Sequence, residues 1–148
     1  MMIRARLRPA LDADIGFARN LYLETMRPVI EELFGWDEEK EVAKFDGQFA
    51  AAEVSVIVLD GRDIGWLQVA DQPDQLFLKQ IYVRPDHQGQ GLGTEVMQSL
   101  IDRANTLRKP VMLGVVKSNP ALALYQRLGF HVTSEDKYKF YMKRPTGA

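Results

Sequence analysis

The sequence predicts an α/β fold built as a single domain over residues 1–148. A chain of 148 residues with 46% hydrophobic and 26% charged side chains is long enough for one buried core and short for two. Apolar residues recur with a period of two in some segments and at helical spacing in others, and these segments alternate along the chain. The expected order is a strand, two or three helices, three strands, a helix, a strand, a helix and two strands.

The N-terminal third is predicted to be mainly helical. Apolar residues alternate with arginines over 3–8, which is typical of a half-exposed strand. Helical spacing of apolar residues then predicts a helix over 12–26. A separate helix is expected over 28–34, because proline is favourable in a first helical turn and a glycine follows Phe34. A third helix is expected over 37–45.

Three strands are predicted in the middle of the chain. Alternating valines indicate a strand over 54–58, and a second strand is expected over 64–70. Asp60-Gly61 between them is a hairpin signal. Residues 76–83 form a third β-rich run, which stops before a proline.

The C-terminal part returns to alternating elements. An amphipathic helix is expected over 96–107 and an apolar strand over 111–116. A short helix over 120–128 ends at a glycine, a favoured C-terminal cap. Two last strands are expected near 130–134 and 138–143.

The composition argues against several classes of function. Lys and Arg number 19 against 20 Asp and Glu, so no net field attracts nucleic acid or anionic lipid. No apolar run approaches the roughly 20 residues of a membrane span, and no signal-peptide pattern opens the chain, so a cytoplasmic protein is expected. The absence of cysteine excludes disulfides, thiolate metal sites and a cysteine acyl-enzyme. Only His87 and His131 carry imidazoles, so no metal centre is expected.

A glycine-rich turn runs from Gln88 to Thr94 between a predicted strand and a predicted helix. Backbone N–H groups at a helix N-terminus lack intrahelical partners, and the helix dipole favours an anion there. Glycines at 89, 91 and 93 let the backbone approach a diphosphate closely. The spacing fits a dinucleotide fingerprint badly, since Thr94 replaces the glycine and several strands precede the turn, and no lysine follows as a P-loop requires. A glycine turn without a ligand remains open on this motif alone.

A second motif lies downstream, from Asn119 to Phe130, and reads Asn-Pro-Ala-Leu-Ala-Leu-Tyr-Gln-Arg-Leu-Gly-Phe. Together with residues 81–93 it resembles the GNAT superfamily of N-acyltransferases. The first motif is similar to the Gln/Arg-x-x-Gly-x-Gly/Ala signature of that superfamily at Gln88, Gly91 and Gly93. The second is similar to its Asn-Pro-Ala-x-x-Leu-Tyr-x-x-x-Gly-Phe block, and the two lie about 30 residues apart in the same order.

The resemblance implies a fold and a set of ligand contacts. It implies a mixed, mostly antiparallel sheet, flanked by helices and splayed between the strand ending near Val83 and the strand at 111–116. Acetyl-CoA, as co-substrate, would lie in that gap, with its pantetheine arm against the first strand and its pyrophosphate on the glycine turn. The cofactor-binding residues so implied are Ile81, Tyr82, Val83, Gln88, Gly89, Gln90, Gly91, Leu92, Gly93, Thr94, Asn119 and Tyr125.

Catalytic roles follow from the same resemblance. Tyr125 is the candidate acid, because the departing thiolate needs a proton and a phenol of pKa about 10 lies near enough to a thiol of about 8.5. Many members of the superfamily carry a carboxylate before the turn, but 78–81 here reads Leu-Lys-Gln-Ile. Glu32 is the candidate general base, and Glu24, Glu31 or a water chain remain alternatives.

An acidic segment can attract the second substrate. Residues 31–46 hold seven acids against two lysines, and such a surface would draw a cationic amine, although a solvated helix face explains it equally well. Tyr22, Met26, Phe34 and Trp36 are candidates for an acceptor pocket, although aromatic and Met residues at helical spacing more often belong to the core.

The expected function is direct transfer of an acetyl group from acetyl-CoA to an amine of a small molecule or protein, in a ternary complex. The first alternative is a non-catalytic CoA-binding module of the same fold. A nucleotide-phosphate binder is a second alternative, but it leaves residues 119–130 unexplained. The C-terminal strands offer an edge that can pair into a homodimer.

Overall fold

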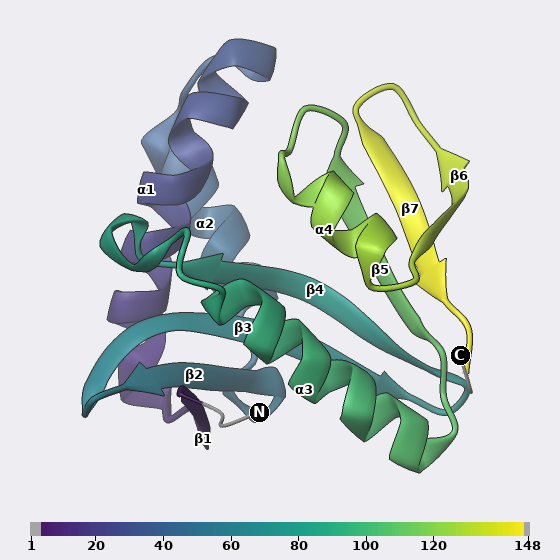
Figure 1. Cartoon of the computed structure of the whole chain (residues 1–148). Coiled ribbons are helices and arrows are strands. Elements are labelled where there is room, and N and C mark those ends of the chain that lie inside the picture. Colours follow the sequence, from purple (N-terminus) through teal and green to yellow (C-terminus); the bar gives the residue numbers. More distant parts are fainter. Residues whose placement is uncertain (1–3, 147–148) are drawn as a thin grey trace. The chain divides into compact units, whose positions relative to one another are not determined.

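The structure is a computed structural model that describes residues 4–146. The first predicted strand includes Ile3, which lies outside the described residues. The element order agrees with the predicted one, apart from the helices of the N-terminal third (Figure 1). The elements are β1 (Arg6–Pro9), η1 (Asp12–Asp14), α1 (Ile15–Phe34), α2 (Glu38–Gln48), η2 (Ala51–Glu53), β2 (Val54–Leu59), β3 (Arg62–Gln72), β4 (Gln75–Val83), η3 (Pro85–His87), α3 (Leu92–Leu107), β5 (Val111–Val116), α4 (Ala121–Arg127), β6 (His131–Glu135) and β7 (Lys139–Arg144).

The seven described strands are hydrogen-bonded in the order β1-β2-β3-β4-β5-β7-β6. The pairs β1–β2, β2–β3, β5–β7 and β6–β7 are antiparallel, whereas β4 and β5 are parallel. The order leaves β1 and β6 as edges, so the sheet is open. The predicted α/β class with a mixed, mostly antiparallel sheet is confirmed.

Contacts within the chain divide it into two compact units. Unit 1 contains the chain up to Gln68 together with Ile81–Gln90. Unit 2 contains Val69–Gln80 and the chain from Gly91 onward. The strands β3 and β4 contribute residues to both units.

In unit 1, a single helix α1 replaces the two helices predicted over 12–26 and 28–34. Pro28 lies inside this helix, which begins at Ile15 and ends at Gly35 with φ of 78°. The prediction of two separate helices was wrong because a proline inside a helix removes one backbone N–H donor and need not end the helix. The carbonyl left without that donor belongs to Glu24, which is exposed. Water can satisfy that carbonyl.

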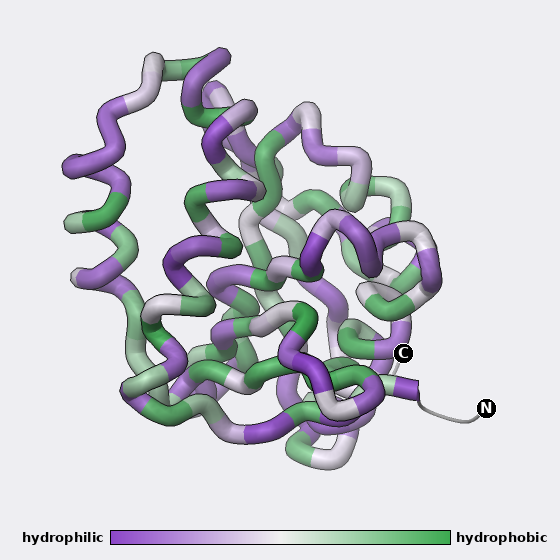
Figure 2. Tube along the Cα trace, turned by 90° about the vertical axis from the view of Figure 1, so that its left-hand side faces the viewer, coloured by the Kyte–Doolittle hydropathy of each residue, from purple (hydrophilic) through white to green (hydrophobic). Residues whose placement is uncertain are grey.

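An aromatic core holds the helices of unit 1 on its strands. Trp66 and Phe45 are 0% and 1% exposed, and their ring centroids lie 5.8 Å apart in an edge-to-face arrangement. Tyr22 of α1 contacts Phe45 of α2 at 5.3 Å and Tyr82 of β4 at 5.9 Å. Figure 2 shows the alternation of hydrophobic and hydrophilic residues along the trace that such packing requires.

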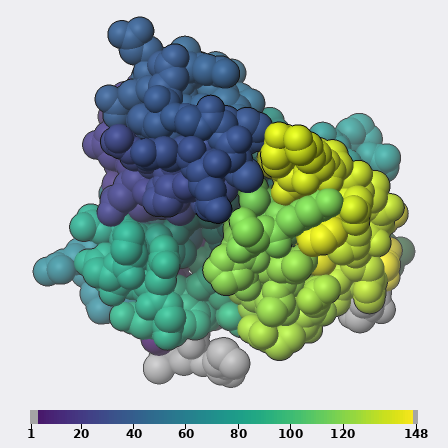
Figure 3. Space-filling model, turned by 90° about the horizontal axis from the view of Figure 1, so that it is seen from above, coloured from purple at the N-terminus to yellow at the C-terminus, as the bar shows by residue number. Residues whose placement is uncertain are grey.

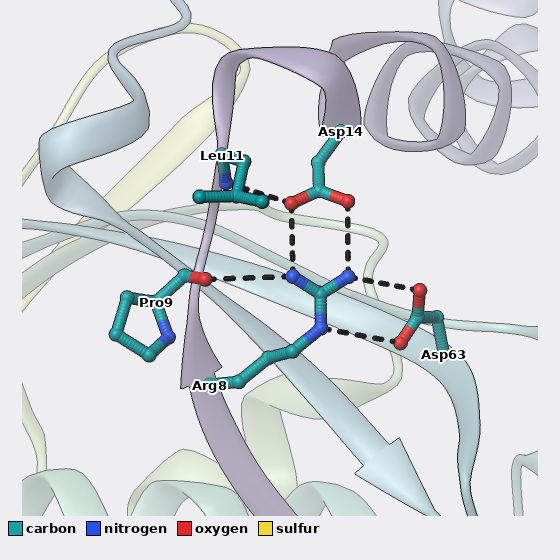
Figure 4. A network of polar contacts seen from close by, with 5 residues as sticks. All are labelled: Arg8, Pro9, Leu11, Asp14 and Asp63. Carbon is teal, nitrogen blue, oxygen red and sulfur yellow. Dashed lines mark hydrogen bonds and ion pairs between the residues drawn. The ribbon is translucent and has the colours of Figure 1, made fainter.

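The Arg8 side chain of β1 forms hydrogen bonds that link the first strand of unit 1 to two other segments (Figure 4). Its Nη1 and Nη2 donate to the two carboxylate oxygens of Asp14, each at 2.9 Å. Its Nη2 and Nε donate to Asp63 of β3 at 2.9 and 3.4 Å. Asp14 also accepts the backbone N–H of Leu11 at 2.7 Å. One guanidinium therefore joins β1, the start of α1 and β3.

The predicted hairpin is present between β2 and β3. Asp60 and Gly61 have φ of 52° and 77°, and left-handed residues at both central positions are typical of a type I′ turn. The strand β3 begins at Arg62, two residues earlier than predicted, and ends at Gln72.

Unit 2 contains three strands from the C-terminal part of the chain and part of β4. Leu76–Leu78 of β4 pair with Val111–Leu113 of β5. The strand β5 pairs along its whole length with β7, which also pairs with β6 (Figure 1). The helix α3 begins four residues before the predicted start and buries one side, made up of Leu92, Val96, Met97, Leu100, Ile101 and Ala104.

Candidate functional site

The glycine turn has the left-handed backbone that its sequence predicts. After η3, Gly89 and Gly91 have φ of 78° and 81°, a region that a Cβ disfavours. An ideal Cβ built on Gly89 or Gly93 would meet no atom within 4 Å, so space lies open beside both residues. Gly89 and Gly91 therefore allow the left-handed backbone of the turn, and the lack of a side chain at Gly89 and Gly93 leaves space that a ligand can enter.

The N-terminus of α3 offers donors to a ligand. Gly91 is the residue before the helix, and no side chain among the described residues caps this end. The first helical bond runs from the Glu95 N–H to the Gly91 carbonyl at 3.0 Å. The N–H groups from Gly91 to Thr94 precede that bond, so they have no partner within the helix. This arrangement suits an anion such as a diphosphate.

Side chains hold the segment that precedes the turn. Gln88 Nε2 donates to the Val83 carbonyl at 2.8 Å, which folds the first signature residue back onto the end of β4. The Arg4 guanidinium donates to the Gln90 carbonyl. Asp86 accepts from the His87 ring at 3.1 Å, and this bond, with the nearby Arg84, lowers the pKa of the Asp86 carboxyl.

In unit 1, β4 ends with the three residues that the resemblance implies for the pantetheine arm. Ile81, Tyr82 and Val83 are each half-buried. The Tyr82 ring packs against Trp66 with centroids 5.2 Å apart. The next residue, Arg84, donates its backbone N–H to the Ile64 carbonyl of β3 at 2.7 Å.

Asn119 and Tyr125 flank the start and the body of α4 in unit 2. Asn119 Oδ1 accepts the backbone N–H of Ala121 at 2.8 Å, so its side chain caps the first turn of this helix. Tyr125 is 7% exposed and its ring lies edge-to-face against Phe130 at 5.9 Å. Burial raises the pKa of the Tyr125 phenol, which keeps the hydroxyl protonated.

Sequence reasoning missed the buried carboxylate of unit 1. Glu32 is exposed on α1. Glu41 of α2, which belonged to the predicted acidic face, is instead 7% exposed and accepts the Tyr22 hydroxyl at 3.0 Å. This bond and burial raise the pKa of Tyr22, burial being the larger cause. The helical position of Glu41, four residues before Phe45, was the available signal.

The end of α1 and the start of α2 lie together at the surface of unit 1 (Figure 3, dark blue), and this region is called the helical tip. Its exposed side chains include apolar and acidic groups. Phe34 is 64% exposed and Leu33 38%. The Arg27 guanidinium lies 5.3 Å from the Trp36 ring centroid and also pairs with Glu31. Of the four residues considered for an acceptor pocket, Tyr22 belongs to the core and Phe34 does not.

Over residues 4–146, no helix is long and apolar enough to cross a bilayer. In the same range, no three His, Asp or Glu side chains are grouped so that they could hold a metal ion.

An open α/β sheet with a glycine-rich, uncapped helix N-terminus is typical of proteins that bind an anion, and comparison with known proteins gives the family. The profile of the acetyltransferase (GNAT) family matches residues 16–130. The chain belongs to this family. The predicted family is thereby confirmed.

Curated relatives match over a short segment. The L-amino acid N-acyltransferase MnaT of Escherichia coli K12 is 49% identical over 57 residues. The L-methionine sulfoximine/L-methionine sulfone acetyltransferase of Pseudomonas aeruginosa PAO1 is 39% identical over 57 residues. In each case the match covers 37% of this chain and 33% of the relative. The chain therefore matches about a third of the length of these relatives.

Solved structures share the fold over nearly the whole chain. The PaiA N-acetyltransferase of Thermoplasma acidophilum in complex with coenzyme A has a TM-score of 0.75 at 15% identity, covering 95% of this chain and 98% of that one. The ribosomal-protein-S18-alanine N-acetyltransferase of Escherichia coli has a TM-score of 0.71 at 22% identity, covering 97% and 96%. At these identities the likeness shows the fold.

Proposed function

We propose that this chain, acting as a single domain, transfers an acetyl group from acetyl-CoA to an amine. The observation that carries the proposal is the uncapped N-terminus of α3 behind the left-handed glycines Gly89 and Gly91, in a segment that contains the signature residues of a family whose profile matches residues 16–130. The coenzyme A complex of the Thermoplasma protein supports the choice of ligand.

The turn fits the diphosphate of CoA. The backbone of Gln88, Gly89, Gln90, Gly91, Leu92, Gly93 and Thr94 is proposed to hold it. The open space beside Gly89 and Gly93 supports this, because a bulky residue there would occupy the approach of the phosphates. The backbone of Ile81, Tyr82 and Val83 is proposed to pair with the pantetheine arm.

When bound, acetyl-CoA supplies an activated acyl thioester. Tyr125 is proposed to hold a proton at its phenolic oxygen and donate it to the departing sulfur. Burial raises the pKa of this phenol, so the hydroxyl carries a proton at neutral pH, and its transfer to the less basic thiolate is proposed to be concerted with the departure of the sulfur. Asn119 is proposed to contact the ligand through the N–H groups of its side chain, because its Oδ1 already accepts from Ala121.

A base must take a proton from the acceptor ammonium before or during attack. Glu32 is proposed for this role, acting directly or through water. Its exposure on α1 supports a site that a solvated amine can reach, and Glu31 beside it is engaged with Arg27 at 3.3 Å. The acidic segment around it favours approach of a cation.

The proposed acceptor is a small primary amine, and α-amino acids are the first class to test. The Escherichia coli and Pseudomonas relatives are named for amino acids and their analogues, which supports this order of testing. A protein amine is the second class. A homodimer and a cytoplasmic location are proposed on the sequence alone.

The test has two steps. Isothermal titration with CoA, acetyl-CoA and a nucleotide of equal charge should show binding that requires the pantetheine arm. Release of free thiol is then followed across L-amino acids, L-methionine sulfoximine, polyamines and peptides. Amine-dependent release supports the enzyme. Binding without release on any amine favours the non-catalytic module, and no binding of CoA contradicts both.

A further inference from the structure

Gly65 of β3 lies against the backbone of the strand end that is proposed to bind CoA. An ideal Cβ at this position would lie 2.3 Å from the Tyr82 carbonyl oxygen and 3.2 Å from Val83 Cα. It would also lie 3.1 Å from Ile57 Cδ1. Contacts below 3.0 Å essentially never occur at a real Cβ. A side chain at residue 65 would therefore force the end of β4 to move by about 0.7 Å.

The close contact also fixes the direction of the backbone groups in β4. The carbonyl of Tyr82 points to β3, and the N–H and C=O of alternate residues in a strand point to opposite edges. Ile81 and Val83 therefore direct their N–H groups to the edge away from β3. The Val83 carbonyl on that edge accepts Gln88 Nε2 at 2.8 Å. The remaining groups of Ile81 and Val83 are those that an extended ligand can pair with.

A backbone hydrogen bond also links the end of β4 to β3. The Arg84 N–H donates to the Ile64 carbonyl at 2.7 Å, and these two residues are the sequence neighbours of Val83 and Gly65. The Tyr82 side chain is fixed between Trp66 and Tyr22, with ring centroids 5.2 and 5.9 Å apart. The backbone contact at Gly65 and the hydrogen bond at Ile64 therefore both act on the end of β4, beside the pairing of β3 with β4 in the sheet.

We propose that Gly65 is a positioning residue for CoA binding: by lacking a side chain, it lets β3 hold the backbone of Ile81–Val83 where the pantetheine arm pairs with it. The inference rests on the proposed function. Gly65 itself touches neither substrate, so a substitution acts through the strand. A displacement of about 1 Å in a substrate-positioning element costs up to 10²-fold in rate, and a lost backbone bond costs about threefold to tenfold in affinity.

Gly65→Ala is the first test, with Ile57→Val, the double variant and Gly47→Ala as controls. We expect CoA to bind Gly65→Ala about tenfold more weakly in isothermal titration. Ile57→Val removes the one side-chain atom among the three atoms nearest to that Cβ, so it should bind CoA normally. The double variant should stay weak because the Tyr82 carbonyl remains. Recovery in the double variant would overturn the proposal. Gly47→Ala, where a Cβ meets nothing within 4 Å, should match the parent protein.

A second pair of variants decides the matter if Gly65→Ala does not fold. Arg84 has φ of -53°, which proline accepts, and Arg84→Pro replaces the N–H bonded to Ile64 at 2.7 Å with a ring carbon that the Ile64 carbonyl cannot accommodate at that distance, so it displaces the same strand end by a second route. Arg84→Ala removes the same charge and keeps the N–H. CoA should bind Arg84→Pro about fivefold more weakly than Arg84→Ala. Equal affinity in folded Gly65→Ala and the parent, or in the Arg84 pair, overturns the positioning role. If the parent protein itself binds no CoA, the proposed function fails first.

Discussion

Replacing Arg8 should lower stability by an amount that the geometry of Figure 4 allows one to work out. Arg8→Ala removes two bidentate pairs, one to Asp14 and one to Asp63, whose side chains are 16% and 40% exposed. A solvent-exposed pair contributes up to about 1 kcal/mol, and a well-aligned charged hydrogen bond contributes about 1.5 to 3 kcal/mol. Counting about 1.5 kcal/mol for Asp14 and about 0.5 kcal/mol for the more exposed Asp63 gives a loss of about 2 kcal/mol.

That loss corresponds to a drop in Tm of about 4 to 8 °C for a chain of this size. Urea unfolding followed by circular dichroism measures the free energy directly, and Arg6→Ala is the matched control because it removes the same charge from an exposed position of β1. The hydrogen bond from Arg8 lowers the pKa of the Asp14 carboxyl. The stability it contributes is therefore present above pH about 4 and is lost as pH falls through the lowered value.

The difference between the parent and Arg8→Ala should accordingly be largest near neutral pH and shrink toward pH 3. Asp14→Asn should reproduce most of the loss in unfolding free energy. In the Asp14→Asn background, the effect of Arg8→Ala should depend little on pH. If Arg8→Ala lies within about 0.5 kcal/mol of Arg6→Ala at pH 7, the network does not stabilise the fold as reasoned.

Three further variants test the site and the buried pair. Tyr125→Phe should lower kcat by about 10²-fold while CoA affinity in isothermal titration stays within about twofold, and an unchanged kcat would exclude the acid role. Gly91→Ala should bind CoA at least about fivefold more weakly, because a left-handed alanine costs about 1 kcal/mol, whereas Thr94→Ala keeps the backbone donors and should bind normally. Glu41→Gln should destabilise by about 1 to 3 kcal/mol in urea unfolding, and combining it with Tyr22→Phe should cost less than the sum; strict additivity would contradict coupling of the pair.

Local patterns carried most of the element prediction. The hairpin at Asp60-Gly61 and the strand over 111–116 follow from turn chemistry and an apolar run, and both agree with the structure. The helix over 28–34 was separated wrongly, because a proline has the same local signal at the start of a helix as inside one that tertiary packing sustains.

The backbone of the glycine turn was predicted because its signal is local, whereas the contact of Glu41 was missed because it depends on distant residues. The glycine turn reads directly from sequence, since left-handed glycines and a helix start lie within a few residues. Glu41 looked like one more acid on a charged segment until its contact with Tyr22, 19 residues away, placed it in the core. Gly65 gave no signal, because its neighbour Tyr82 belongs to another strand.

The two tryptophans make the described part of unit 1 its own fluorescent reporter. Trp66 is fully buried among Phe45, Phe49 and Tyr82, and no described residue accepts its indole N–H, so its emission should be blue-shifted and report on the core. Trp36 lies beside the Arg27 guanidinium at the helical tip. In a Trp36→Phe variant, Trp66 would be the remaining tryptophan. A shift of its emission to longer wavelength during unfolding would report that water has entered between α1, α2 and the strands.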